Sequence, residues 1–248
     1  MNHFIGIDIS KLDFHVCFSE GGDILKFNND NPGIRLFIKT LKVHKCAPSN
    51  TLIALESTGS YHLPVAYLCS QAGYTVNVIN PLITKKQNQI SLRRVKTDEK
   101  DARLIRHCLI GGAGQSFRET AESLALKMLV RNRARFSMLR QRMRLRHEEV
   151  KRRESYLKVR ITDINLEFHH FLDEKIHLLD AILRKHEPKT QKLLQTIPGV
   201  GPQTAVTCLS EIGDIKRFPD AQKLTAWIGL DPRVHLSGTS IHGKGYIT

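Results

Sequence analysis

Long apolar runs are missing from this sequence, and so are the cysteine patterns of metal and disulfide sites. No stretch approaches the roughly eighteen consecutive apolar residues of a membrane-spanning helix, so the sequence predicts no membrane segment. The N-terminus has no basic region followed by an apolar region, and we expect no export signal. The five cysteines are scattered without a C-x-x-C pair, which argues against zinc and disulfide frameworks and fits reduced thiols in a cytosolic compartment.

Acidic residues are also scarce. The 248 residues include 24 Asp and Glu against 38 Lys and Arg, and the formal net charge is +14. Such a surplus indicates a polyanionic partner, with nucleic acid the first candidate and an anionic membrane surface the second. The hydrophobic fraction of 41% supports a real core, and the length fits one large domain or two smaller ones.

Residues 1–112 predict a mixed α/β domain. Short apolar runs alternate with helical patterns in the order three strands, helix, strand, helix, strand, helix. The first strand is buried and carries one carboxylate, Asp8, and Gly6 allows close backbone approach beside it. The expected strands are residues 3–9, 12–19, 23–28, 51–56 and 74–79. The expected helices run from residue 34 to about 44, from 64 to 72 and onward from about 97.

Residues 113–187 predict a basic helical or coiled-coil linker. Nearly every residue from 119 to 186 favours helix, with a break expected near residues 160–163. Between Lys127 and Arg160 there are thirteen Lys and Arg against three Glu. This stretch is either a solvated helical arm or a basic helix lying along a phosphate backbone, and the charge favours the second. The arginines expected to contact nucleic acid are Arg131, Arg133, Arg135, Arg140, Arg142 and Arg144, with Arg233 further along the chain.

Residues 188–248 predict a mainly helical C-terminal domain. The segment from Ile197 to Gly201, Ile-Pro-Gly-Val-Gly, looks like the turn of a helix-hairpin-helix. Such a turn presents backbone N–H groups and a helix N-terminus to a phosphate, so we expect nucleic-acid contact at Gly199 and Gly201. An ordinary helix–helix turn is the alternative.

Four carboxylates stand out in this basic chain. Asp8 and Glu56 lie on strands of one expected sheet, and Asp98 and Asp101 share a face at a helix start. Four carboxylates can hold two Mg²⁺ ions, which serve phosphoryl transfer. Taken singly, each acid also has a structural explanation: a turn cap at Asp8, a salt bridge at Glu56, and helix capping at Asp98 and Asp101.

Five segments then occur in a specific order along the chain: Ile-Gly-Ile-Asp8, Leu-Glu56-Ser-Thr-Gly, Lys-Thr-Asp98-Glu-Lys-Asp101-Ala, Ile197-Pro-Gly-Val-Gly and Ala226-Trp-Ile-Gly-Leu-Asp-Pro-Arg233. Together they resemble the DEDD transposases of the insertion-sequence "one-ten" family, over essentially the whole chain. The resemblance implies an RuvC-like, ribonuclease H-like mixed sheet in the N-terminal domain, then the helical linker and a C-terminal transposase domain.

The resemblance also implies the site residues. Asp8, Glu56, Asp98 and Asp101 would be the catalytic metal ligands, for two Mg²⁺ ions. The family's nucleophilic serine maps onto Ser237, which would attack a DNA phosphodiester and form a covalent serine–DNA link. These residues would make the protein an insertion-sequence transposase that cleaves and exchanges DNA strands.

The partners follow from the same resemblance. They are donor and target DNA, a guide RNA encoded by the element, and further copies of the chain in a dimer or tetramer. Base pairing by the RNA would then choose the sequence, while the protein contacts shape and backbone. The expected location is the bacterial cytoplasm, in association with the nucleoid.

Two other functions remain open at the level of sequence. The carboxylates could serve a metal nuclease of the Holliday-junction-resolvase type that does not use Ser237. Family members usually continue beyond the point where this chain stops, with a Ser/Thr-Lys-x-Gly segment and further basic helices. The chain could therefore be a truncated, inactive nucleic-acid-binding remnant.

Overall fold

The structure is a computed structural model, and it describes residues 3–57, 59–90, 98–185, 189–230, 236–237 and 241–242. Within these ranges, only the backbone is described for residues 88–90, 98–99, 236–237 and 241–242. The chain divides into two compact units, Met1–Thr120 and Ala121–Thr248. Each unit is described by itself below.

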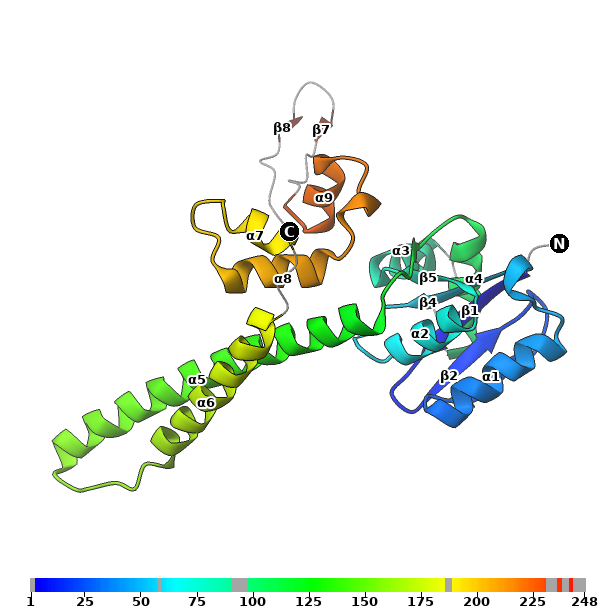
Figure 1. The fold of residues 1–248 in the computed structure, drawn as a ribbon. Coiled ribbons are helices and arrows are strands. Elements are labelled where there is room, and N and C mark those ends of the chain that lie inside the picture. Colours follow the sequence, from blue (N-terminus) through cyan, green and yellow to red (C-terminus); the bar gives the residue numbers. More distant parts are fainter. Residues whose placement is uncertain are drawn as a thin grey trace. The chain divides into compact units, whose positions relative to one another are not determined.

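The first unit is built on a six-stranded mixed sheet with the order β3-β2-β1-β4-β5-β6 (Figure 1). The strands are β1 (His3–Ile9), β2 (Asp13–Cys17), β3 (Ile24–Asn28), β4 (Thr51–Glu56), β5 (Thr75–Ile79) and β6 (Gln115–Ser116). β1, β4 and β5 run parallel, whereas β2, β3 and β6 pair antiparallel with their neighbours. This confirms the α/β fold class and five expected strands. β6 was not expected, because two residues carry no periodic pattern.

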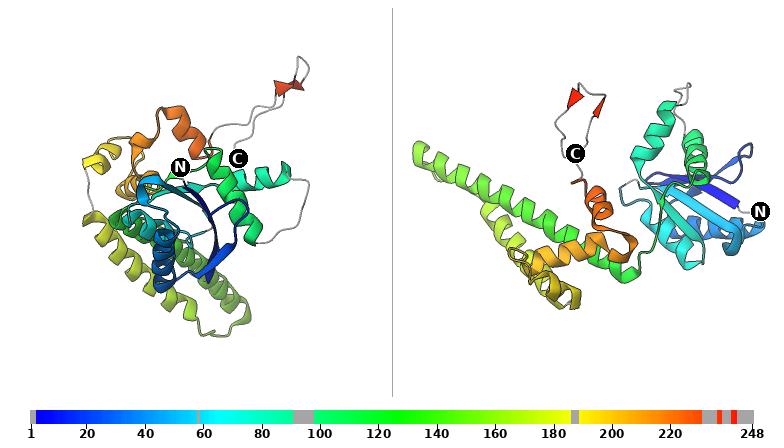
Figure 2. Two further views of the ribbon diagram at one scale, coloured as in Figure 1. Left: turned by 90° about the vertical axis from the view of Figure 1, so that its right-hand side faces the viewer. Right: turned by 90° about the horizontal axis from the view of Figure 1, so that it is seen from above.

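Helices cover both faces of the sheet, as Figure 2 shows. The helices are α1 (Asn31–Val43), α2 (Leu63–Gln71), α3 (Pro81–Ile90) and α4 (Asp98–Ile110), with a short 3-10 turn at Pro48–Asn50. α1 begins three residues before the expected start, because the Asp30 carboxylate accepts a hydrogen bond from the Gly33 N–H at 2.7 Å. Pro32 in the first turn suits that position, since its missing N–H is not needed there.

Side chains alternate between two cores along the central strands. Ile5, Ile7 and Ile9 of β1 join the core under α1 and α2, where the Phe14 and Phe37 rings meet edge to face at 5.6 Å. The opposite face of the sheet packs against α4, in a core centred on Ala54, Ile79, Ile105, Cys108 and Leu109. Because side chains alternate along a strand, the face of the sheet that α4 covers carries the even-numbered residues of β1.

Gly6 makes the contact between β1 and α4 possible. A Cβ atom at Gly6 would lie 2.3 Å from the Ala102 carbonyl oxygen and 2.4 Å from the Arg106 nitrogen. The Arg106 Nε also donates a hydrogen bond to the Phe4 carbonyl at 2.8 Å. The helix backbone thus lies directly on the strand, at a place where only a residue without a side chain fits.

The second unit begins with a long helical hairpin, α5 (Ala121–Leu157) and α6 (Ile164–Lys185), whose helices lie side by side. The break at residues 158–163 confirms the expected position. Two ion pairs tie the helices together: Arg133 Nε to Asp180 Oδ1 at 2.9 Å, and Arg140 Nη1 to Asp173 Oδ1 at 2.8 Å.

The rest of the second unit contains short elements. They are α7 (Lys189–Leu194), α8 (Pro202–Ile212), a 3-10 turn η2 (Ile215–Arg217), α9 (Ala221–Trp227) and a small hairpin of β7 (Leu236–Ser237) with β8 (Ile241–His242). Val130, Leu183 and Val206 join α5, α6 and α8 in one apolar core. Among the helices that the structure describes, none is both long and apolar enough to cross a membrane.

Candidate functional site

Asp8 and Glu56 lie side by side at the carboxyl ends of two neighbouring parallel strands. β1 and β4 are paired so that Ile7 faces Leu55, and the next step along both strands brings Asp8 opposite Glu56. Neighbouring strands are about 4.8 Å apart. Carboxylates on neighbouring strands repel each other when they point to the same face, and a cation close by relieves this repulsion.

Both carboxylates belong to the face of the sheet that α4 covers. Asp8 is two residues beyond Gly6 on β1, and Glu56 is two residues beyond Ala54 on β4. Gly6 touches the backbone of α4, and Ala54 is buried in the core beneath it. Side chains two residues apart in a strand point to the same face, so Asp8 and Glu56 are directed towards the α4 side of the sheet.

α4 contributes the other two acids from its first turn. Asp98 is the first residue of the helix, and Asp101 comes directly before Ala102, whose carbonyl oxygen touches Gly6. Asp101 and Asp8 are therefore each within two residues of the closest contact between α4 and β1. The side chain of Asp98 lies outside the described residues.

Thr84 supports the site, and sequence reasoning missed it. Its hydroxyl donates a hydrogen bond to Glu56 Oε2 at 2.7 Å, and Thr84 is only 6% exposed. α3 places it there because the helix begins at Pro81, directly after β5. A threonine in the first turns of a basic helix carries no distinguishing pattern, so no sequence signal could have identified this partner.

The donor chemistry of this region suits a hard divalent cation. Carboxylate oxygens are the ligands that Mg²⁺ and Mn²⁺ prefer. Among the described side chains, however, Asp8, Glu56 and Asp101 do not bring three oxygen atoms within 4.8 Å of one another.

A different group in the described part of the chain does meet that distance: His169, His170 and Asp173 on α6. The Asp173 carboxylate is already ion-paired with Arg140 at 2.8 Å. A cation there would compete with a guanidinium, which disfavours a metal.

The serine segment forms part of the β7–β8 hairpin. Ser237 ends β7 and faces Ile241 across the hairpin. The structure describes only the backbone at this position, and Arg233 lies outside the described residues. The expected role of Ser237 therefore remains a prediction.

The expected helix-hairpin-helix turn joins α7 to α8. Gly199 has φ +86°, in the left-handed region that favours glycine, and Gly201 precedes α8 as its N-cap residue. Apart from the chain neighbours, no described residue lies within 4 Å of a Cβ built at Gly199 or Gly201. In the described part of the chain no side chain caps the first turn of α8, and Gly201 and Pro202 are exposed, so this helix N-terminus suits an anion.

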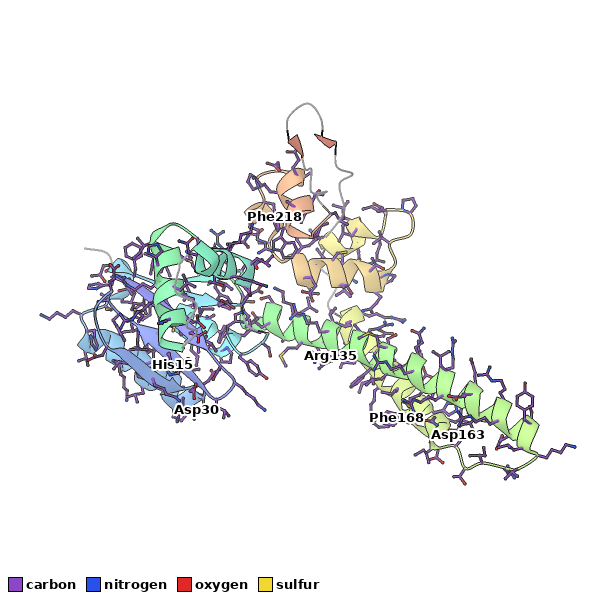
Figure 3. All side chains as sticks on the ribbon, turned by 180° about the vertical axis from the view of Figure 1, so that it is seen from behind. His15, Asp30, Arg135, Asp163, Phe168 and Phe218 are labelled. Carbon is purple, nitrogen blue, oxygen red and sulfur yellow. The ribbon has the colours of Figure 1, made fainter. Side chains whose placement is uncertain are left out.

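The arginines of α5 divide into two groups. Arg131 forms a double hydrogen bond with Glu211 of α8, at 2.8 Å and 2.7 Å, while Arg133 and Arg140 pair with acids of α6. Arg144 lies 3.6 Å from Glu148 one turn along α5. In the part of the chain that the structure describes, Arg135 (Figure 3) and Arg142 are exposed and form no ion pair; these two remain available to a polyanion.

Basic partners lower the pKa values of three acids in the second unit. The hydrogen bonds from Arg131 hold the pKa of Glu211 below its ordinary value of 4.5, and those from Arg140 lower the pKa of Asp173 below 3.8. At the tip of the hairpin, His147 lowers the pKa of Asp163 in the same way. Asp163 also accepts a hydrogen bond from the Asn165 N–H at 2.9 Å and so caps α6.

Comparison with protein families gives two matches in chain order. A family model for DEDD transposases of the IS110 type, described as "Transposase", matches residues 5–150. A second model, described as "Transposase IS116/IS110/IS902 family", matches residues 191–248. The first match includes all four carboxylates, and the second includes the turn at Gly199 and the segment of Ser237.

Individual relatives agree with these families. The pilin gene-inverting protein of Moraxella bovis is 29% identical over 98% of this chain and 76% of its own length. The transposase for insertion sequence element IS1328 of Yersinia enterocolitica is 24% identical over 94% of this chain and 75% of its own length. A shorter match, 49% identical over 45 residues, is to the transposase for insertion sequence element IS1111A of Coxiella burnetii.

Proposed function

This chain belongs to the IS110 family of transposases, and we propose that it cleaves and exchanges DNA strands with a carboxylate-held Mg²⁺ centre and the Ser237 hydroxyl. One observation carries the proposal. Asp8 and Glu56 end adjacent parallel strands on the face that α4 covers, and α4 begins with Asp98 and Asp101. Four acids that the sequence spreads over more than ninety residues thus come from three elements packed together.

Asp8, Glu56, Asp98 and Asp101 would hold the metal. When bound, Mg²⁺ supplies stabilisation of charge on the phosphate and leaving oxygens. Thr84 holds Glu56 in place by its 2.7 Å hydrogen bond, because a carboxylate with one oxygen fixed keeps the other directed at the site. The basic chain around this acidic centre favours approach of a polyanion.

Ser237 would carry the covalent step. Its oxygen attacks the phosphorus of a DNA phosphodiester, the bond from phosphorus to the deoxyribose oxygen breaks, and that oxygen leaves with the proton. The resulting phosphoserine conserves the energy of the bond for rejoining to a second strand. Because the four acids and Ser237 belong to different units of the chain, the reaction needs the two units to meet on one DNA, within one subunit or between subunits.

Membership of the family implies DNA binding, and we assign the contacts as follows. The open turn at Gly199 and Gly201 and the N-terminus of α8 bind a phosphate. Arg135 and Arg142 extend the phosphate contacts along α5. We further propose a guide RNA that selects donor and target by base pairing, and a homo-oligomer that brings two DNA sites together.

The test is strand exchange between donor and target DNA, with Mg²⁺ and RNA transcribed from the flank of the element. Parallel reactions use Ser237→Ala and Asp8→Ala. We expect both variants to abolish exchange, and only the parent to leave a covalent protein–DNA adduct on denaturing gels.

Each outcome decides something. Exchange that survives Ser237→Ala would replace the serine mechanism with a metal nuclease of the junction-resolving type. Exchange that survives Asp8→Ala would remove the acids from the reaction. Unchanged exchange without RNA would exclude guidance by base pairing.

A further inference from the structure

Two aromatic rings in the second unit contact the side chain of one arginine. Phe218, labelled in Figure 3, and Trp227 at the end of α9 have ring centroids 5.5 Å apart, at an angle of 58°. The Arg217 guanidinium carbon lies 4.5 Å from the centroid of each ring. The guanidinium thus contacts both rings at once, an arrangement of the cation–π type.

Trp227 and Arg217 of this group are exposed, and Phe218 is partly buried. Trp227, the single tryptophan of the chain, is 40% exposed. Ile228 and Leu230, within three residues of Trp227, are 48% and 52% exposed, and Ile215, two residues before Arg217, is 52% exposed. Single exposed apolar residues are ordinary, but several around an exposed tryptophan mark a surface that binds something.

The charges around the rings select the partner. Lys216, next to Arg217 in sequence, and Lys223 of α9 are both exposed. The nearby acids Asp214 and Asp220 are engaged as helix caps, accepting hydrogen bonds from the Lys216 N–H at 3.0 Å and the Lys223 N–H at 2.8 Å. The caps also fix the ends of η2 and α9, so the rings lie on a defined support.

We propose that Arg217, Phe218 and Trp227 form a stacking site for an unpaired nucleobase, with Lys216 and Lys223 facing the adjoining phosphates. Exposed aromatic rings among cations are how proteins bind single-stranded nucleic acid. A base within a duplex has both faces covered by its neighbours, whereas an unpaired base offers a free face to a ring or a guanidinium. The site therefore takes a single strand or a loop, in DNA or RNA, without preference for sequence.

The inference deepens the proposed function and rests on it, because the unpaired strand would be part of the nucleic acid that this enzyme handles. Strand exchange and RNA pairing both expose unpaired bases. The proposed stacking site uses none of the residues proposed for the strand chemistry, so the two proposals can fail separately.

The single tryptophan gives a direct measurement. The full chain is titrated with a short single-stranded oligonucleotide while the fluorescence of Trp227 is followed, and then with the same length of abasic strand and with a blunt duplex. We expect quenching by the single strand and not by the abasic strand, which has the same phosphates but no bases. Equal quenching by the abasic strand would overturn the proposal, because it would show phosphate contact alone.

Variants provide a second measurement. Trp227→Leu should weaken binding of a labelled single strand by about 5- to 150-fold, the range for loss of one base–aromatic stack, and leave duplex binding unchanged. Tyr156→Leu, at another exposed aromatic residue of the same unit, is the matched control and should change neither.

Failure of this proposal differs from failure of the proposed function. A parent chain that binds duplex and single strand without any quenching refutes the stacking site alone. A parent chain that binds no nucleic acid refutes both. Quenching by an added protein or peptide, with none by any oligonucleotide, would assign the rings to a protein partner instead.

Discussion

Replacing Gly6 with alanine tests how the acidic site is assembled. The new Cβ would lie 2.3 Å from the Ala102 carbonyl oxygen and 2.7 Å from the Arg106 Cβ, and the nearer atom is backbone. Real Cβ atoms almost never come within 3.0 Å of another heavy atom, so α4 must retreat by at least 0.7 Å (3.0 minus 2.3). No rotation of a side chain can relieve a contact between a strand and the backbone of a helix.

The displacement has two measurable consequences. Overpacking of this kind costs about 1–3 kcal/mol in the free energy of unfolding. The second concerns catalysis: α4 carries Asp98 and Asp101, and a misplacement of about 1 Å at a reacting site reduces the rate by on the order of 100-fold. We therefore expect Gly6→Ala to reduce the rate of strand exchange by on the order of 100-fold under conditions in which the protein is still folded.

Urea unfolding and strand exchange in Mg²⁺ are measured on the same preparation. Gly21→Ala is the matched control, because none of the described residues, its chain neighbours apart, lies within 4 Å of a Cβ there. The control should stay within about 0.5 kcal/mol of the parent and keep full activity. If Gly6→Ala matched Gly21→Ala in both measurements, the idea that close packing of α4 on β1 positions the acids would be refuted.

Three further predictions concern other contacts. Thr84→Val, which removes the hydrogen bond to the β4 carboxylate, should lower affinity for Mg²⁺ by about 10- to 100-fold in calorimetry, whereas Thr40→Val, whose hydroxyl bonds only a backbone carbonyl, should not. Arg142→Gln should weaken DNA binding and reduce the salt slope by about 1 in anisotropy titrations, whereas the ion-paired Arg133→Gln should instead lower the free energy of unfolding. Because the pKa of Glu211 is held below 4.5, its stabilising contribution is complete above that pH and is lost as the pH falls through the lowered pKa. Circular dichroism of the helical signal under mild denaturant should then show stability falling with acid below about pH 4.5, and a variant Glu211→Gln should show less of this fall.

The secondary structure could be predicted from the sequence where hydrophobic periodicity and turn or cap residues agree. Five strands of the sheet follow from apolar runs between turn residues, and the break between α5 and α6 follows from the loss of helical pattern near residue 160. Gly6 was correctly interpreted as a place of close approach, although the helix that approaches it could not be named. Local patterns predict elements, but not which elements meet.

The rest depends on contacts between distant parts of the chain. β6 has two residues and forms only because the turn after α4 brings Gln115 and Ser116 alongside β5. The arginines of α5 look equivalent in sequence, and only their pairing with α6 and α8 separates Arg133 from Arg142. The four acids were grouped by their places on expected strands and a helix start, but only the resemblance assigned them as catalytic metal ligands.

The pairing of β1 with β4 also sets when the acidic site can exist during synthesis. Asp8 and Glu56 are neighbours in the sheet but 48 residues apart in the chain (56 minus 8), and the helix that closes their face ends only at Ile110. A growing chain whose α4 is still inside the ribosome cannot yet bring Asp98 and Asp101 to Asp8 and Glu56. If the four acids hold the metal as proposed, the site would be complete only after α4, which ends at Ile110, has left the ribosome.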